Sequence, residues 1–211
     1  MKYLKVIAIF FIASFQFGCS SIKKFNDPEA GLSNPARGNV LVSITAEPEK
    51  YTHDAWIFIR KKGASGDVEP TRLAAFGFTL MGFQKPNDYP EVSPSKGRLV
   101  AASLEPGEYE LYNWQLYIAV FGGNGYISPK DPPAPIYFTI KPSTTTYLGR
   151  IHIGTVLAKN IVGMNVAAGA SPKFSNHFKR DSEIATQKFS SFATWPIDQV
   201  SIAENIWLPR E

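Results

Sequence analysis

The chain of 211 residues is 44% hydrophobic, 13% aromatic and only 19% charged, which allows one well-filled core and excludes a disordered polypeptide. Its formal net charge is +4, but Lys2 and Lys5 lie in the first 18 residues, and the rest of the chain carries 20 basic against 18 acidic side chains. The longest basic run, residues 60–62, is short, so nucleic acid is not an expected partner.

The first 18 residues have the pattern of a signal peptide. A positively charged start is followed by an almost wholly apolar stretch at residues 6–15, which is too short to span a bilayer as a helix. Cys19, the only cysteine of the chain, follows Gly18 directly. A single cysteine also excludes a disulfide within the chain.

The pair Gly18-Cys19 resembles the lipobox of bacterial lipoproteins. The resemblance implies that signal peptidase II cleaves before Cys19 and that acyl chains on Cys19 anchor the protein stably in a membrane. Ser20, in place of Asp, is similar to lipoproteins that are sent on to the outer membrane. Gln16 stands where the family prefers Leu, which leaves an ordinary secretory signal, cut after Ser20, as the alternative.

Residues 19–38 are predicted to be a flexible tether, because they are rich in Asn, Asp, Pro, Ser and Gly and poor in large apolar residues. Residues 39–211 are predicted to form the folded domain. Its first strand candidates either alternate polar and apolar side chains or are short runs of strand formers. They lie at residues 39–45, 55–60, 72–80 and 98–104.

The sequence LEPGEYELYNW at residues 104–114 predicts a β-hairpin whose turn is the Pro-Gly pair at residues 106–107. The strand after the turn, residues 109–121, is long and is expected to bend. Its apolar side chains change face between Leu111 and Tyr112, which predicts a β-bulge there. The alternative is a strand that is covered on both faces.

The second half of the chain has strand candidates at residues 136–141, 144–153, 161–168 and 172–179. In the second of these, Tyr147, Ile151 and Ile153 are expected to share one face. Residues 202–208 are expected to form a final edge strand.

One helix is predicted near the C-terminus. Asp181 or Ser182 can cap it, Trp195-Pro196 ends it, and its apolar stripe is expected to dock on a sheet. Together, the many short strands and turn signals predict a mainly β fold, a single antiparallel β-sandwich with one short C-terminal helix docked on it.

The sequence shows little that indicates catalysis. His53, His152 and His177 do not lie at metal-ligand spacing, and no zinc-protease, serine-elbow or phosphate-loop motif is present. We therefore expect no enzyme activity, no cofactor and no metal. A hydrolase whose site is assembled from distant residues stays the least favoured alternative.

Two long loops, residues 81–97 and 122–135, are the candidate binding surface. If the Pro-Gly turn closes a hairpin, both loops leave from its opposite end and share one surface. Exposed aromatic side chains there suit contact with a sugar or a peptide. The candidates are Asn87, Asp88, Tyr89, Asn124, Tyr126 and Lys130. The plainer interpretation is that both loops are only long surface connections.

The LEPGEYELYNW stretch, with FTIKPS at residues 138–143 and YLGRIHI at residues 147–153, resembles uncharacterised Gram-negative envelope lipoproteins. Similar hairpins occur in transthyretin-like and carboxypeptidase-regulatory-like sandwiches. The resemblance covers residues 98–196 and brings no catalytic residue with it. We expect a lipid-anchored outer-membrane protein on the periplasmic side that acts as a non-catalytic binding or structural module, with an envelope protein or a glycan as partner. The alternative is an accessory lipoprotein of a secretion, pilus or outer-membrane assembly machine.

Overall fold

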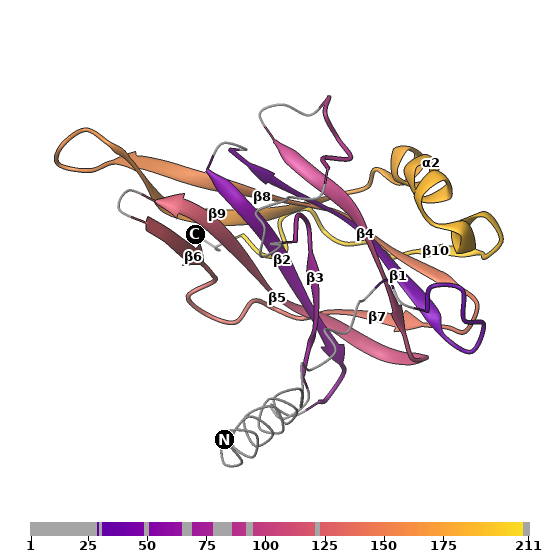
Figure 1. Ribbon diagram of the computed structural model, residues 1–211. Helices are drawn as coiled ribbons and strands as arrows, with labels where there is room; N and C mark the ends of the chain where they lie inside the picture. Colours follow the sequence, from indigo (N-terminus) through magenta and orange to yellow (C-terminus); the bar gives the residue numbers. More distant parts are fainter. Residues whose placement is uncertain are drawn as a thin grey trace, which may run out of the picture.

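The computed structural model describes residues 29, 31–48, 51–64, 69–77, 86–91, 95–120 and 123–208, and these form two packed β-sheets with one short α-helix (Figure 1). The predicted signal peptide and Cys19 lie outside the described residues. The prediction of a mainly β sandwich with one docked helix is confirmed.

Each sheet contains five strands. Sheet A consists of β4 (Lys96–Leu104), β1 (Gly38–Glu47) and β8 (Thr145–Lys159), with β9 (Asn165–Ser175) and β10 (Ile197–Gln199) along the far side of β8. Sheet B consists of β3 (Thr71–Ala74), β2 (Thr52–Lys61) and β5 (Gly107–Val120), with β6 (Gly123–Ile127) and β7 (Ile136–Ile140) along the far side of β5. Sheet B is antiparallel throughout, whereas β8 pairs in parallel with β1 and β10.

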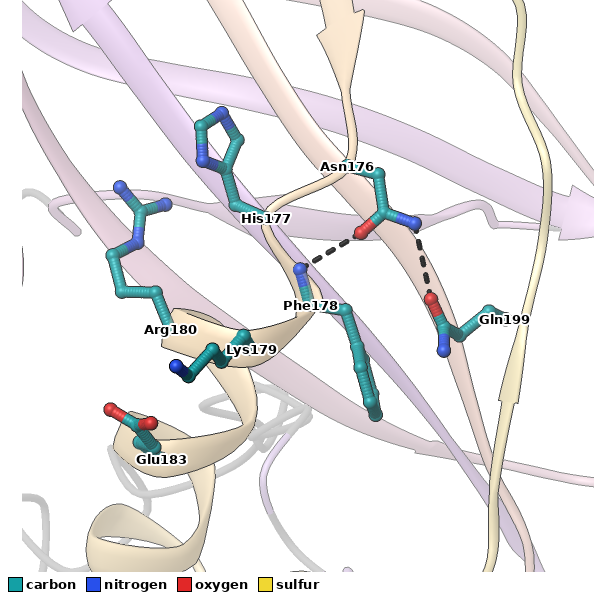
Figure 2. A pocket seen from close by; sticks show the side chains of 7 residues that line it. All are labelled: Asn176, His177, Phe178, Lys179, Arg180, Glu183 and Gln199. Carbon is teal, nitrogen blue, oxygen red and sulfur yellow. Dashed lines mark hydrogen bonds between the residues drawn. The ribbon is translucent and has the colours of Figure 1, made fainter.

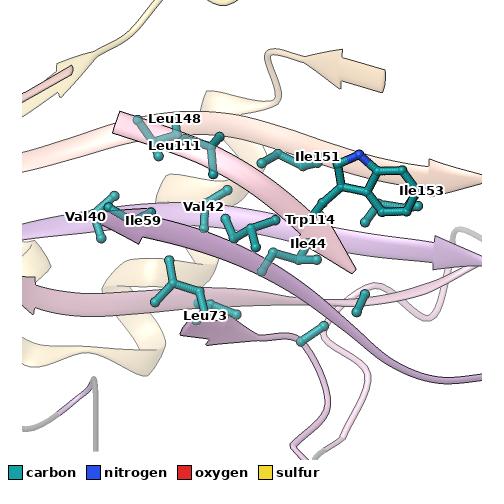
Figure 3. Packing of buried hydrophobic residues seen from close by; sticks show 14 of the residues in the cluster. Val40, Val42, Ile44, Ile59, Leu73, Leu111, Trp114, Leu148, Ile151 and Ile153 are labelled. Carbon is teal, nitrogen blue, oxygen red and sulfur yellow. The ribbon is translucent and has the colours of Figure 1, made fainter. Parts of the chain in front are cut away.

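The main hydrophobic core lies between the two sheets. Figure 3 shows aliphatic side chains of β1 and β8 packed against those of β2 and β5, with the indole of Trp114 among them. Because successive strand residues point to opposite faces, alternate positions such as Val40, Val42 and Ile44 all enter this core.

The Pro106-Gly107 turn does not close a hairpin, so that prediction is wrong. Strand β4 pairs with β1 in sheet A, whereas β5 pairs with β2, β6 and β7 in sheet B. The turn therefore carries the chain from one sheet to the other. Turn chemistry fixes the reversal of the backbone, but the partner of each strand is chosen by distant strands. The two candidate loops therefore do not leave from one end of a hairpin: the first leads from β3 of sheet B to β4 of sheet A, and the second connects strands of sheet B.

The β-bulge predicted between Leu111 and Tyr112 is confirmed. In the pairing of β5 with β2, Ile59 lies opposite Leu111 and Phe58 lies opposite Asn113, so Tyr112 is the extra residue. This one-residue shift lets both Leu111 and Trp114 point into the core.

A second bulge reverses the expected facing of Tyr147. In the pairing of β8 with β1, two residues of β8 occupy the place of one, and Gly149 has a φ of +86°. Leu148 and Ile151 therefore face the core, while Tyr147 faces the opposite side of sheet A. The expectation that Tyr147 shares a face with Ile151 is wrong, because Gly149 supplies the left-handed conformation that the bulge needs.

The helix α2 (Phe178–Lys188) lies on this outer side of sheet A and is followed by a 3₁₀ helix, η1 (Ser190–Ala193). It begins before the predicted caps, with His177 as the N-cap residue, so Asp181 lies inside its first turn. The apolar residues of this side form a second hydrophobic cluster. They are Leu41, Tyr89, Leu99, Ala101, Tyr147, Ala185, Phe189 and Phe192.

Two further elements differ from the prediction. The two weaker strands expected between residues 161 and 179 are one strand, β9, that pairs along β8. The expected edge strand at residues 202–208 is instead a turn. Trp207 there packs edge-on against Phe174, and its indole N–H donates to the Ala134 carbonyl at 2.7 Å.

Candidate functional site

The predicted loop site is divided between the two sheets. Tyr89 is 0% exposed on the outer side of sheet A, whereas Tyr126 is 61% exposed on strand β6 of sheet B. The prediction that both are exposed on one surface is wrong. Asn124 and Lys130 are exposed close to Tyr126 in the chain, on the side of sheet B.

The side chains of Asn87 and Asp88 bind backbone groups of the protein and do not line a solvent-facing surface. The Asn87 side-chain oxygen accepts hydrogen bonds from the amides of Tyr89 and Gly97, at 3.0 and 2.9 Å. The Asp88 carboxylate accepts the Leu99 amide at 2.8 Å and an ion pair from Lys188 of α2 at 2.5 Å. These contacts fix the loop against β4 and the helix.

Tyr89 belongs to a buried polar group that we call the Asp181 cluster, formed by Ser43, Tyr89, Tyr147, Arg180 and Asp181. The Asp181 carboxylate is 0% exposed. It accepts hydrogen bonds from the hydroxyls of Tyr147 at 2.6 Å, Tyr89 at 3.2 Å and Ser43, and from the Arg180 guanidinium at 2.9 Å. The Arg180 guanidinium also lies over the Tyr89 ring, 4.1 Å from its centroid.

Burial, together with the neighbouring Asp181 carboxylate, raises the pKa values of both tyrosines, so both stay protonated donors. The Ser43 hydroxyl donates to the Asp181 carboxylate and lies 2.7 Å from the Tyr89 hydroxyl. Neither of these partners is a histidine, the base that commonly activates a serine nucleophile. The cluster is suited to fixing helix α2 on sheet A.

A shallow cavity of about 650 Å³ opens beside the first turn of α2. Figure 2 shows the Asn176 side chain bridging its two walls, because its oxygen accepts the Phe178 amide and its nitrogen donates to Gln199. Arg180 lines it, but its guanidinium is already bound to Asp181. The remaining lining residues are His177, Lys179 and Glu183. The cavity is open to solvent, and its polar groups are largely engaged in hydrogen bonds at the start of α2.

The outer side of sheet B carries a continuous group of aromatic side chains, which we call the aromatic face: Trp56 and Phe58 of β2, Tyr112 and Tyr117 of β5, and Tyr126 of β6. The rings of Trp56 and Tyr117 are nearly parallel, at 12° and 6.4 Å between centroids. Tyr117 and Tyr126 are paired residues of neighbouring strands and stack at 4.9 Å. Phe58 and Tyr112 pack at 6.4 Å further along the same strands.

Trp56 is held in place by Asp54. The indole N–H donates to the Asp54 carboxylate at 2.7 Å, and the same carboxylate accepts the amides of Ala55, Phe76 and Gly77. Burial raises the pKa of Asp54, although these hydrogen bonds oppose the effect. Trp56 is therefore a positioned ring rather than a freely rotating surface side chain.

Cationic side chains flank the rings. The Arg72 guanidinium lies 4.8 Å from the Trp56 ring centroid, and that of Arg60 lies 4.3 Å from the Tyr112 ring. Arg60 is also paired with Glu110 at 2.5 Å. From Tyr112 to Tyr117 the strand covers about 17 Å, so the aromatic face is elongated along β5.

The site predicted from sequence does not include this face. The compact run at residues 56–59 predicts a strand, and within it Trp56 and Phe58 alternate with Ile57 and Ile59. The aliphatic pair is fully buried and the aromatic pair is partly exposed. Aromatic side chains at every second position, opposite an aliphatic face, are the signal that could have revealed it.

No protein-family model matches this sequence, and comparison with curated proteins finds no relative. Among the residues described by the structure, no three His, Cys, Asp or Glu side chains are grouped so that they could hold a metal ion. In the same part of the chain, none of the helices has the length and hydrophobicity to cross a bilayer.

Proposed function

We propose that the protein is a lipid-anchored outer-membrane protein, on the periplasmic side, that binds saccharide chains non-catalytically through the aromatic face. The observation that carries the binding proposal is the cluster of positioned rings formed by Trp56, Tyr117 and Tyr126, whose centroids lie 4.9–6.4 Å from one another, with Phe58 and Tyr112 further along the same strands. The lipid anchor is supported by the sequence pattern that ends at Cys19.

A saccharide fits the chemistry of this face. Sugar rings present C–H groups that pack on aromatic rings, and their hydroxyl groups need hydrogen-bond partners beside those rings. Here the rings alternate with polar side chains, including the Gln115 amide, which donates to the Ser128 hydroxyl at 2.9 Å, and with the guanidinium groups of Arg60 and Arg72. A face that extends about 17 Å along the strand suits a linear chain more than a single small molecule.

Strand addition at the edge of sheet A is less well supported. Strand β9 is a long edge strand, but its sequence places Pro172 and Lys173 within it. Proline and lysine are residues that protect an edge against pairing with another strand. The accessory-protein alternative therefore has no specific support from this edge.

The binding proposal is tested by sedimentation with purified peptidoglycan glycan strands. We expect Trp56→Ala and Tyr126→Ala each to weaken binding by about tenfold, the loss typical of one well-packed aromatic contact. Trp195→Ala removes a partly exposed tryptophan that follows η1, away from this face, and serves as the matched control. Equal binding by Trp56→Ala and the control would refute the proposal.

The anchor is tested separately. We expect Cys19→Ser to abolish labelling by a fatty-acid analogue and to release the protein from the membrane fraction. Unchanged labelling would end the lipid-anchor proposal and leave the saccharide proposal intact.

A further inference from the structure

The tip of the β8–β9 hairpin, residues 156–164, exposes more apolar side chains than any other described segment. Ile161 is fully exposed, and Val162, Val156 and Leu157 are 65%, 58% and 37% exposed. Isolated exposed apolar residues are common on protein surfaces, but four within seven positions form a patch. The patch lies at the far end of sheet A from the Asp181 cluster and is not part of the aromatic face.

The hairpin projects beyond the rest of its sheet. Strand β1 pairs with β8 only as far as Glu47 opposite Gly154, whereas β9 continues to pair with β8 up to Lys159 opposite Asn165. In Figure 1 this part is the orange ribbon that extends past the other strands. A two-stranded ribbon therefore holds the apolar tip clear of the domain.

The turn at the tip binds its own polar backbone groups. The Asn160 side-chain oxygen accepts the amides of Val162 and Met164, and the Asn160 carbonyl accepts the amide of Gly163. The Asn160 amide donates to the Met164 carbonyl. Transfer of a backbone group into an apolar environment is costly unless the group is already hydrogen-bonded. The amides of residues 162–164 therefore enter an apolar environment already hydrogen-bonded.

The charged side chains of the hairpin itself have one sign. Residues 132–180 contain no Asp or Glu, and Lys159 is exposed directly beside the tip. Lys173 is also exposed, but it pairs with His152 near the base of the hairpin, where Glu47 of β1 lies opposite Gly154. An apolar tip with a lysine beside it is complementary to the surface of a bilayer with anionic headgroups, in which the apolar groups enter the acyl boundary and Lys159 stays among the phosphates.

We propose that the β8–β9 tip inserts into the interface of a bilayer that contains anionic lipids. Ile161 and Val162 are the inserted side chains, and Lys159 contacts the headgroups. Because β1 runs parallel to β8 and starts beside Thr145, the chain enters sheet A at the end opposite the tip. With one membrane contact at the N-terminal anchor and a second at the tip, the strands of sheet A lie along the membrane. The domain is then not held to the membrane by its tether alone. This orientation rests on the proposed anchor at Cys19, whereas insertion of the tip does not.

The test uses the chain from Ser20 onward, which lacks Cys19 and is therefore free of cysteine. It contains every residue of both hydrophobic clusters and so the complete core. A polarity-sensitive fluorophore is attached at Ile161→Cys, and at Glu183→Cys on helix α2 as the control. With vesicles of phosphatidylcholine and phosphatidylglycerol, we expect a blue shift at the tip and none at the control. No shift at Ile161→Cys would overturn the proposal.

Sedimentation with the same vesicles gives a second measurement. We expect Ile161→Asp with Val162→Asp to weaken binding by at least about tenfold, and Lys159→Ala by about fivefold at low salt. Ile206→Asp, which changes an exposed isoleucine near the C-terminus, should bind as the unmodified chain does. If the double variant instead dissociates an oligomer and leaves vesicle binding unchanged, the tip is a contact between copies and the proposal is wrong.

Discussion

Asp181→Ala should be among the most destabilising single substitutions in this protein. The change removes the acceptor of the Tyr147 hydroxyl, whose only other hydrogen bond among the described residues is donated to it by the His177 amide. Tyr89 and Ser43 can still bond to each other, because their oxygens lie 2.7 Å apart. One orphaned buried hydroxyl costs about 1–3 kcal/mol. Loss of the partner of Arg180 and a small cavity bring the total to about 3–5 kcal/mol.

Urea denaturation measures this loss as a lower midpoint with an unchanged m value. In a thermal scan it corresponds to a fall in Tm of about 10 °C for a domain of this size. Glu183→Ala is the matched control, since it removes an exposed acid two residues further along the same helix. A loss for Asp181→Ala within about 1 kcal/mol of the control would show that the cluster does not hold helix α2 in place.

Two further predictions test other parts of the account. The folded pKa of Tyr147 is raised above its unfolded value of about 10, so the stability that this residue contributes is complete below pH 10 and is lost as the pH rises further. Tyr147→Phe should therefore flatten the fall in the free energy of unfolding between about pH 10 and 11.5 by up to about 1.4 kcal/mol per pH unit. An unchanged slope would contradict this prediction. Gly149→Ala places a Cβ 2.9 Å from the Ser175 carbonyl oxygen at positive φ, whereas Gly163→Ala shares the positive φ but meets no atom within 4 Å. Denaturant unfolding should show a loss of about 1 kcal/mol for Gly163→Ala and about 2–3 kcal/mol for Gly149→Ala, and equal losses would mean that the bulge can relax.

Patterns within a few residues predicted the strands well. Alternation of apolar side chains located β1, β5 and β8, runs of strand formers and turn signals located β2, β4 and β7, and the change of face at Leu111-Tyr112 located the bulge in β5. These signals are local because a side chain's facing depends only on its position along its own strand.

The failures concern what distant parts of the chain decide. The Pro106-Gly107 pair specifies a turn, but whether the flanking strands pair with each other depends on β1 and β2, which pair with them instead. The sequence around Tyr89 is typical of an aromatic residue in a loop. In the structure its hydroxyl donates a hydrogen bond to Asp181, which lies far along the chain, and the side chain is buried there. No local pattern encodes such a contact.

One residue of the aromatic face was predicted as a site residue. Tyr126 was identified as an exposed aromatic, and it lies in the aromatic face with Trp56 and Tyr117. The compact run at residues 55–60 predicts the strand that carries Trp56, but a run of strand formers does not by itself say which face of the strand lies outward. Its position over sheet B also depends on the hydrogen bond to Asp54.

The most direct test of the saccharide proposal is a map of amide chemical shifts in the ¹⁵N-labelled chain from Ser20 onward during titration with soluble peptidoglycan glycan fragments. The account predicts saturable shifts concentrated on β2, β5 and β6, together with a shift of the Trp56 indole N–H. Shifts confined to the cavity beside the start of α2, or no saturable shifts, would contradict it.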